Sequence, residues 1–477
     1  MPLDLKSLIA SRLGENYLLH ERHVNPTLVA VQRIIGFDQV FARASGAFLF
    51  DREGREYLDF LSGYSVFNLG RNHPAVQQAI RDVLDLELPN MVQMDCSLLS
   101  GLLAEALLRK LPEHLDAVYF CNSGAEAVEG AIKFARAATG RSGLVSLAGS
   151  FHGLTHGALS VMGDPHFHEG FGPLLEGCSR VALGDLAALR ERLTTRNVAA
   201  LVIEPVQGKG VHFPSGEFFR EAQRLCRETG TLLLCDEVQT GLGRTGRWWG
   251  FEHWGLEPDL VTLAKSLSGG YVPCAAVVTR RAIYQGTFSR LDRCVVHSST
   301  FGRNNLAMAC GLATLGVLED EGLVERARVQ GAELLRRLEE MRSRHSLIKE
   351  VRGLGLMLAI EFHEPREFAA RMGWKLLQRV EPGLFAHMLV TSLNTRHRIL
   401  TQVAGHSMNV IKLLPPLIIG EVEIERFVTA LDSVLAECRS FPGPMWDFGA
   451  NLVRQSLRTS SARHAEPLTT VADQVPA

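Results

Sequence analysis

The sequence predicts an α/β protein with a mostly parallel central sheet that has helices on both faces. Three apolar runs, 199–203, 232–235 and 260–264, have the length and composition of buried strands. A helical pattern over 218–227 separates the first two runs. Near-continuous apolar strands that alternate with helices are typical of parallel sheets covered on both sides. Ligands of such sheets bind at the carboxyl ends of the strands.

Each of the three runs ends in a charged residue at that edge of the sheet. Glu204 follows the first run, Asp236 the second and Lys265 the third. A lysine and an aspartate at one sheet edge are the pair that a pyridoxal 5'-phosphate (PLP) enzyme requires. The lysine amine forms a Schiff base with the cofactor aldehyde, and the carboxylate pairs with the pyridinium nitrogen. Without these neighbours, Lys265 would be read as a solvated lysine that opens a loop.

Composition and charge restrict the class of protein. The chain has 477 residues and a formal net charge of -2, so no strong field points to nucleic acid or to an anionic membrane. Its nine cysteines are scattered and form no C-x-x-C pair, which is typical of a reduced, cytoplasmic protein. We see no signal peptide and no apolar run of the ~18 residues that a membrane span needs. His152 and His156 lack a third ligand, so they are interpreted as polar loop residues and no metal site is expected.

Two stretches carry a resemblance to a known family. Residues 235–246, Cys-Asp-Glu-Val-Gln-Thr-Gly-Leu-Gly-Arg-Thr-Gly, and the run 258–270, which contains Ala-Lys-Ser-Leu-Ser-Gly-Gly, resemble the class III aminotransferases. This PLP-dependent family includes acetylornithine, ornithine, 4-aminobutyrate and putrescine aminotransferases. The resemblance extends over about 26–438 and is densest over 122–305. It implies PLP-dependent transferase fold type I, with a large domain around the central sheet and a smaller α/β domain from both ends of the chain.

The resemblance also implies how the chain is divided. We expect an N-terminal segment over 1–75, a large PLP-binding domain over 76–335, a C-terminal small domain over 336–440 and a tail over 441–477 whose end is disordered. Within these limits the patterns predict a broken amphipathic helix, a hairpin, a strand followed by a helix, a charged helix, two strand regions and a closing helix. These elements are expected over 5–35, 48–60, 117–138, 319–344, 348–361, 410–416 and 422–438. The first helix either lies across a partner subunit or forms a mobile arm.

The cofactor contacts follow from the resemblance. Ser123, Gly124 and Ala125 are expected to hold the phosphate, and free N–H groups at a helix N-terminus suit that role. Ser123 with Glu126 is also a capping box, a structural reading that is compatible with the first. Phe151 is expected to stack on the cofactor ring.

Further contacts are implied on both sides of the ring. Val238 would pack on the face opposite the stacked phenylalanine, and Gln239 would reach the phenolic oxygen. His152 and Glu204 are expected beside the cofactor. Thr300 would donate its hydroxyl to the phosphate in the neighbouring subunit, which implies a homodimer with shared active sites and leaves a tetramer open.

The substrate side departs from the family pattern. Leu154 stands where relatives carry arginine or lysine, and leucine offers no donor to a carboxylate. Tyr64 and Phe67 match the loop that lines the substrate entrance, although interface packing explains them equally well. Lys209 replaces a glutamate and is expected to face Arg352, with an anionic acceptor such as 2-oxoglutarate between them. The alternative is that Lys209 turns outward to solvent.

These observations lead to one functional expectation and its alternatives. We expect an aminotransferase that moves an amino group between a primary amine, either a polyamine or a more apolar amine, and a keto acid such as 2-oxoglutarate or pyruvate, or an aldehyde. An ornithine-like ω-amino acid aminotransferase, an aminomutase, a decarboxylase and a PLP-free interaction protein are the alternatives. Lys412 is interpreted as structural.

Overall fold

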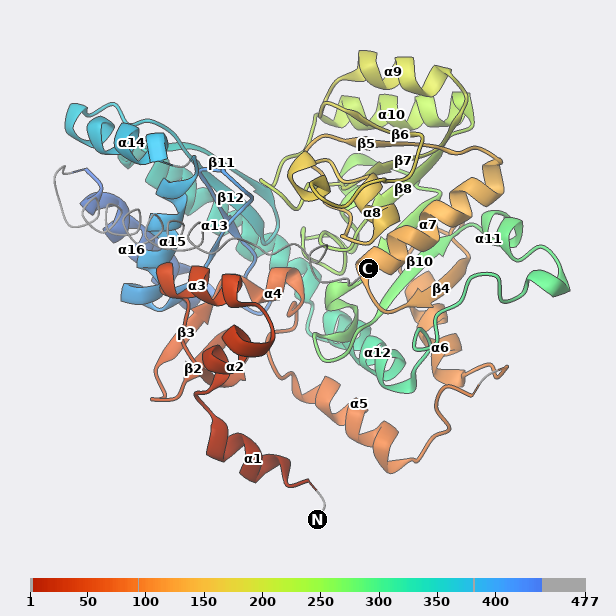
Figure 1. Ribbon diagram of the computed structural model, residues 1–477, viewed down its shortest axis with the longest axis horizontal. Coiled ribbons are helices and arrows are strands. Elements are labelled where there is room, and N and C mark those ends of the chain that lie inside the picture. The colour runs from red at the N-terminus through yellow and green to blue at the C-terminus, as the bar shows by residue number, and fades with distance from the viewer. Residues whose placement is uncertain (1–2, 93, 381, 440–477) are drawn as a thin grey trace, which may run out of the picture.

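A computed structural model describes residues 3–92, 94–380 and 382–439 (Figure 1). Its largest feature is a seven-stranded sheet in the order β4-β10-β9-β8-β7-β5-β6. The strands are β4 (Ala117–Cys121), β10 (Ala275–Thr279), β9 (Leu260–Leu263), β8 (Leu232–Asp236), β7 (Val198–Ile203), β5 (Gly143–Leu147) and β6 (Cys178–Val181). The five strands from β9 to β6 are parallel, while β10 runs antiparallel to both of its neighbours. The prediction of a mostly parallel sheet is confirmed.

Helices cover both faces of this sheet because its strands are apolar on both sides. On one face, Leu201 and Leu233 belong to the same core cluster as Phe219 of α10 (Gly216–Thr229). On the other face, the next residues along the strands, Ala200 and Leu234, pack in the cluster of α7 (Gly124–Thr139). Alternation along each strand therefore serves two cores. Further helices around this sheet are α5 (Pro74–Asp85), α6 (Leu98–Leu108), α8 (His156–Ser160), α9 (Leu186–Thr194), α11 (Arg281–Thr287) and α12 (Asn305–Asp320).

Two four-stranded sheets lie beside it, toward the left of Figure 1. The first contains β1 (Phe41–Ser45), the predicted hairpin of β2 (Phe48–Asp51) and β3 (Glu56–Asp59), and β13 (Ile399–Leu400). The pairing of β3 with β13 joins segments from opposite ends of the chain. The second sheet is antiparallel and contains β11 (Ile348–Leu354), β12 (Met357–Phe362), β15 (Val410–Leu413) and β14 (Gln402–Val403).

The N-terminal helical region is broken twice. It forms α1 (Leu5–Arg12), α2 (Asn16–His23) and α3 (Pro26–Ile34). Asn25 caps α3 by accepting a hydrogen bond from the Leu28 amide, and Pro26 occupies the first turn, where its missing N–H costs nothing. The predicted interruption at Pro26 is therefore the start of a separate helix.

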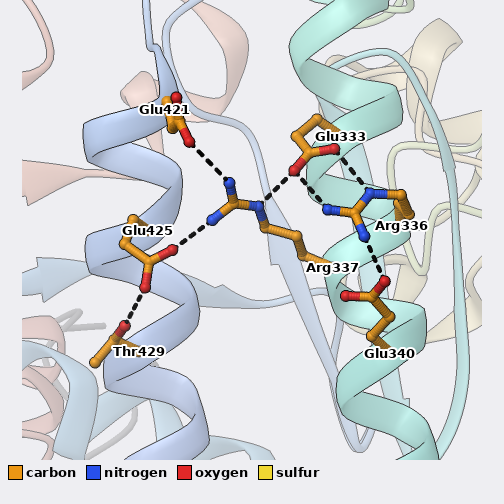
Figure 2. A network of polar contacts seen from close by, with 7 residues as sticks. All are labelled: Glu333, Arg336, Arg337, Glu340, Glu421, Glu425 and Thr429. Atoms are coloured by element: carbon orange, nitrogen blue, oxygen red, sulfur yellow. Dashed lines mark hydrogen bonds and ion pairs between the residues drawn. The ribbon is translucent and has the colours of Figure 1, made fainter.

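Two helices of the second half are joined by charged side chains. In Figure 2, Arg337 of α13 (Leu323–Arg344) lies between Glu333 of its own helix and Glu421 and Glu425 of α16 (Glu421–Glu437). Arg336 also donates to Glu333, at 2.8 Å. The helices α14 (Phe368–Val380) and α15 (Leu384–His397) lie between α13 and α16 in the sequence.

The proposed domain boundaries remain a prediction, and the tail predicted over 441–477, with the disorder expected at its end, falls outside the described residues. Among the described helices, none is long and apolar enough to span a bilayer.

Candidate active site

One cavity of about 1150 Å³ opens at the carboxyl ends of β7, β8 and β9. Most of the residues predicted for the cofactor and substrate line it together. They are Tyr64, Ser123, Gly124, Ala125, Phe151, His152, Leu154, Glu204, Lys209, Asp236, Val238, Gln239 and Lys265. Phe67, Thr300 and Arg352 are not in its lining.

Lys265 follows β9 after a single residue and begins the short helix η3 (Lys265–Ser268). Its φ angle of 49° lies in the left-handed region, a strain that costs ~1–3 kcal/mol for a residue with a side chain. Burial lowers the pKa of Lys265 below its ordinary value, although the charges of Asp236 and Glu204 oppose that shift. A lowered pKa increases the fraction of neutral, nucleophilic amine at neutral pH.

Asp236 is the last residue of β8 and is held on both carboxylate oxygens. Its Oδ1 accepts hydrogen bonds from the Val238 amide at 3.1 Å and from Thr262 Oγ1 at 3.0 Å. Its Oδ2 lies 2.8 Å from His152 Nδ1. Burial alone would lower the pKa of His152, but the hydrogen bond and charge of Asp236, with the charge of Glu204, raise it above its ordinary value. Sequence reasoning missed Thr262, because a threonine inside an apolar strand carries no signal of its own.

Glu204 shapes the opposite wall of the cavity through the backbone. Its two carboxylate oxygens accept hydrogen bonds from the amides of Phe151 at 2.8 Å and Gly208 at 2.6 Å. Burial raises the pKa of Glu204, and the nearby Asp236 carboxylate raises it further. Glu204 thereby fixes the backbone of the phenylalanine that is expected to stack on the cofactor.

The first turn of α7 supplies a site for an anion. Ser123 caps the helix by accepting a hydrogen bond from the Glu126 amide at 3.2 Å, and the Glu126 carboxylate returns to the Asn122 amide. At Gly124, a Cβ atom would lie 2.9 Å from a methyl group of Val238, so only glycine permits this approach. Free N–H groups and the helix dipole favour a phosphate at this point.

These residues fit PLP. The helix N-terminus suits the phosphate, Asp236 suits the pyridine nitrogen and Lys265 suits the aldehyde, and all three line one cavity. His152 gives independent support for a bound group at this site. Its Nε2 is buried here without a hydrogen-bond partner among the described residues.

Lys209 and Arg352 require a correction. Lys209 Nζ lies 2.5 Å from Asp164 Oδ2 and 4.2 Å from the ring centre of Phe167, and its side chain is only 12% exposed. It therefore neither turns to solvent nor stands as an unneutralised charge opposite Arg352. Arg352 instead donates to the Gly210 carbonyl at 2.8 Å and pairs with Glu350 and Glu361. Asp164 precedes Lys209 by 45 residues, a separation that gives no sequence signal.

Lys412, which the sequence leaves as a structural residue, also lies at this site. It lines the cavity from β15, and its Nζ donates to the Gly208 carbonyl at 2.6 Å and to Gln239 Oε1 at 3.3 Å. Burial, with the positive charge of Lys265, lowers the pKa of Lys412 to about 7. The one signal in the sequence is a lone lysine inside an apolar strand.

The remaining predicted residues lie at or beyond the rim. Tyr64 and Leu154 line the cavity and are 55% and 57% exposed. Phe67 lies under the Arg71 guanidinium, at 4.1 Å from the ring centre. Thr300 is exposed on the surface of the subunit.

The fold and the cavity define a PLP-dependent transferase of fold type I. The chain belongs to the class III aminotransferases, because the family described as aminotransferase class-III matches residues 33–435. It is accordingly a PLP-dependent aminotransferase.

Three relatives place it within the known proteins. It is 38% identical to the aminotransferase PigE of a Serratia species, over 88% of this chain and 53% of PigE, so it spans about half the length of that relative. It is 39% identical to the putrescine aminotransferase of Pectobacterium atrosepticum, over 75% of this chain and 78% of that protein. The structure of the ornithine aminotransferase of Toxoplasma gondii, which is described with partial occupancy of PLP, superposes on this chain with a TM-score of 0.75 at 27% identity. The superposition covers 96% of this chain and 100% of the Toxoplasma chain.

Proposed function

We propose that this aminotransferase takes its amino group from a primary amine. The reacting end of this amine carries no carboxylate, and the rest of the molecule is apolar. The acceptor is a keto acid such as pyruvate or 2-oxoglutarate. The observation that carries this proposal is the rim of the cavity, where apolar side chains stay exposed. Leu154, Leu28 and Val31 are 57%, 48% and 45% exposed there. Apolar groups left in water around a cavity are typical of a ligand-binding surface.

The distribution of charge favours an apolar amine over a polyamine. A polyamine carries a second ammonium group, which would need an acidic partner in the outer cavity. Among the described residues of the lining, the acids are Glu204 and Asp236, and both are engaged at the inner end. Leu28 and Val31 of α3 and Ile35, the C-cap of that helix, instead line the cavity, and their spacing of three and four residues puts them on one side of the helix.

The acceptor is an anion, and the inner cavity offers it the Lys412 amine, whose ammonium form an arriving carboxylate would favour. The Lys412 amine is hydrogen-bonded to a carbonyl and an amide oxygen, while Lys209 is neutralised by Asp164. We therefore assign the carboxylate of the keto acid to Lys412. A charge-assisted contact of this kind contributes ~1.5–3 kcal/mol.

The chain's own residues divide the chemical work. PLP, when bound, supplies an electrophilic aldehyde and an electron-withdrawing ring. Lys265 Nζ would hold the cofactor aldehyde and, when free, would move a proton to or from the substrate carbon as general base and acid. Asp236, held by His152 and Thr262, would pair with the ring nitrogen. Ser123 and Gly124 hold the phosphate at the start of α7.

A shared active site is also part of the proposal. Thr300 is exposed and lies outside the lining of its own subunit's cavity, which suits a residue that serves the neighbouring subunit. We infer a homodimer of this kind. The nine cysteines are free thiols, which supports a reducing, cytoplasmic compartment.

A panel of amines tests the substrate class. Linear alkylamines of increasing length, putrescine and ornithine are mixed in turn with the PLP form, and conversion to the aminated cofactor is followed by absorbance. Each buried CH₂ is worth ~0.8 kcal/mol, so kcat/KM should rise about fourfold per carbon until the cavity is filled. Putrescine or ornithine as the best donor would contradict the proposal, and release of CO₂ would indicate a decarboxylase.

Leu154→Arg provides a matched variant for the same panel. Arginine adds a donor for a carboxylate at the rim and removes apolar surface. We expect kcat/KM for the longer alkylamines to fall about tenfold and that for ornithine to rise. Leu291→Arg serves as control, because Leu291 is 94% exposed and outside the cavity lining.

A further inference from the structure

Four consecutive residues at the rim of the cavity have left-handed backbone. They form α4 (Ser62–Ser65), with φ angles of 41° at Ser62, 61° at Gly63, 64° at Tyr64 and 73° at Ser65. L-residues other than glycine rarely adopt this region, and almost never in succession. Such backbone persists only where surrounding contacts over-determine it, and it clusters at functional sites. The left-handed turn is therefore a place to look for function.

Contacts from two directions fix the beginning of the turn. Asp59 Oδ1 accepts hydrogen bonds from the amides of Leu61 at 3.0 Å and Ser62 at 2.7 Å. Ser62 Oγ donates to the Leu414 carbonyl at 2.5 Å. The turn is thus tied to β3 behind it and to the residue after β15 beside it.

The end of the turn is fixed by Arg244, which is completely buried. Its guanidinium donates to Ser65 Oγ at 2.8 Å, Asn68 Oδ1 at 2.6 Å, and the carbonyls of Leu356 at 2.9 Å and Pro415 at 2.5 Å. No carboxylate among the described residues forms an ion pair with it. Burying a cation on neutral acceptors alone is costly, and burial lowers the pKa of Arg244 to about 9. An apolar side chain would fill this space more cheaply, so the value of Arg244 lies in the direction of its donors.

The turn carries this fixed geometry into the cavity. The Tyr64 side chain lines the cavity, and its carbonyl accepts a hydrogen bond from Gln239 Nε2 at 3.2 Å. Ser65 Oγ accepts from Arg244, and its hydroxyl lies within hydrogen-bond distance of two acceptors, Asn68 Oδ1 at 3.2 Å and the backbone carbonyl of Gln239 at 3.3 Å. Gln239 Oε1 in turn accepts from Lys412. A single chain of hydrogen bonds thus connects the buried guanidinium to the wall of the cavity.

We propose that Arg244 and Ser65 are positioning residues for substrate recognition, because they hold Tyr64 at the rim and Gln239 on the inner wall in one fixed relation. The left-handed turn sets the width of the cavity for the outer part of the amine. The small keto acid binds at the inner end and does not reach Tyr64. This inference rests on the proposed function for the choice of amine and for the keto acid carboxylate at Lys412.

Three serine variants of the holoenzyme test it. Ser65→Ala removes the hydroxyl that connects Arg244 to Gln239. Ser65→Asn keeps an oxygen that accepts from Arg244, and asparagine is the residue after glycine that most readily adopts left-handed backbone. Ser343→Ala is the control, because Ser343 is exposed and donates only to a carbonyl of its own helix. The amine is whichever donor the parent enzyme uses best, so failure of the substrate proposal does not decide this test.

We expect Ser65→Ala to raise KM for the amine about tenfold, with kcat within twofold of the parent. KM for pyruvate should rise no more than threefold, because Lys412 keeps its hydrogen bond to the Gly208 carbonyl when Gln239 shifts. Ser65→Asn should stay within threefold of the parent for both substrates. The visible circular dichroism band of the bound cofactor should change in Ser65→Ala and not in the other two variants. Equal loss with both substrates, or a lower melting temperature with an unchanged KM for the amine, would show that Arg244 and Ser65 only stabilise the fold. Failure of Ser65→Asn to restore KM would equally overturn the proposal.

Discussion

Two lysines from distant parts of the chain share the cavity, and burial affects both in the same direction. Lys265 and Lys412 each have a pKa below the ordinary lysine value, because burial disfavours the ammonium form. The charge of Lys265 lowers the pKa of Lys412 further, whereas Asp236 and Glu204 oppose the shift at Lys265. Their partners separate the roles. Lys265 lies under the influence of two carboxylates, while Lys412 is bonded to neutral oxygens. The first is suited to nucleophilic chemistry and the second to binding an anion.

The stability of the cofactor-free protein should depend on pH through Lys412. Between its folded pKa of about 7 and its ordinary value of 10.5, the unfolded chain holds a proton that the folded protein lacks. The stability of the folded state therefore rises with pH over this interval and is lowest below about pH 7. Lys412→Met removes this penalty, so we expect the free energy of unfolding to increase at pH 6 by on the order of a few kcal/mol and by much less at pH 10.

Urea unfolding at the two pH values measures the difference directly. Lys6→Met, on the exposed side of α1, is the matched control and should change little at either pH. A Lys412→Met gain that is equal at pH 6 and pH 10 would show that packing, rather than charge, explains it.

At the scale of elements, strand ends were predictable and the contacts between loops were not. An apolar run followed by a single charge locates the end of a strand, so Glu204, Asp236 and Lys265 could be placed at one edge from sequence alone. The hairpin of β2 and β3 was equally predictable, since an acidic turn with a glycine interrupts the alternation of apolar and polar residues. The pairing of Lys209 with Asp164 depends on how a loop folds over the cavity, and local sequence does not encode that.

The charged contacts between α13 and α16 contribute modest stability. Arg337 contacts three glutamates with a side chain that is 17% exposed, and hydrogen bonds from Arg336 and Arg337 lower the pKa of Glu333 to about 2. A depressed carboxylate pKa stabilises the fold above about pH 4.5, and the contribution is lost as pH falls toward 2. We expect Arg337→Met to lower the free energy of unfolding by ~1 kcal/mol at pH 7 and by less near pH 3.

Thermal or urea unfolding at both pH values distinguishes this network from a surface ion pair. Arg342→Met is the comparison, because Arg342 is more exposed and pairs only with Glu339 three residues earlier. It should change stability by a few tenths of a kcal/mol or less. Equal effects of the two substitutions would show that the contacts of Arg337 stabilise the fold no more than an exposed ion pair does.

At the scale of the whole molecule, the fold class and the cofactor site were largely visible in the sequence, and the substrate side was not. Motifs with fixed spacing lie on strand ends and helix starts, where backbone geometry repeats between proteins. Arg352 illustrates the opposite case, since its acidic partners lie on its own sheet and it does not line the cavity. The position of Lys412 in the cavity lining was not predictable, because burial beside a cavity is a property of the assembled structure.

The shared site predicts complementation between two defective chains. Thr300→Ala should weaken PLP binding about tenfold or more, since one charge-assisted hydrogen bond to the phosphate is worth ~1.5–3 kcal/mol. Lys265→Ala should abolish turnover. In a mixed dimer, one site would combine Lys265 of the Thr300→Ala chain with Thr300 of the Lys265→Ala chain. We expect mixing after reversible dissociation to restore full PLP affinity in that site, whereas no restoration would show that each subunit is self-sufficient.

The central claim is that Lys265 and Asp236 serve the same cofactor ring. The most direct measurement is reduction of the PLP-loaded protein with borohydride, followed by mass spectrometry of its peptides. The account predicts that the cofactor mass is attached to Lys265 alone, and that Lys265→Ala loses both the attachment and the visible absorbance band. Attachment to Lys412 or to another lysine, with Lys265 unmodified, would contradict it.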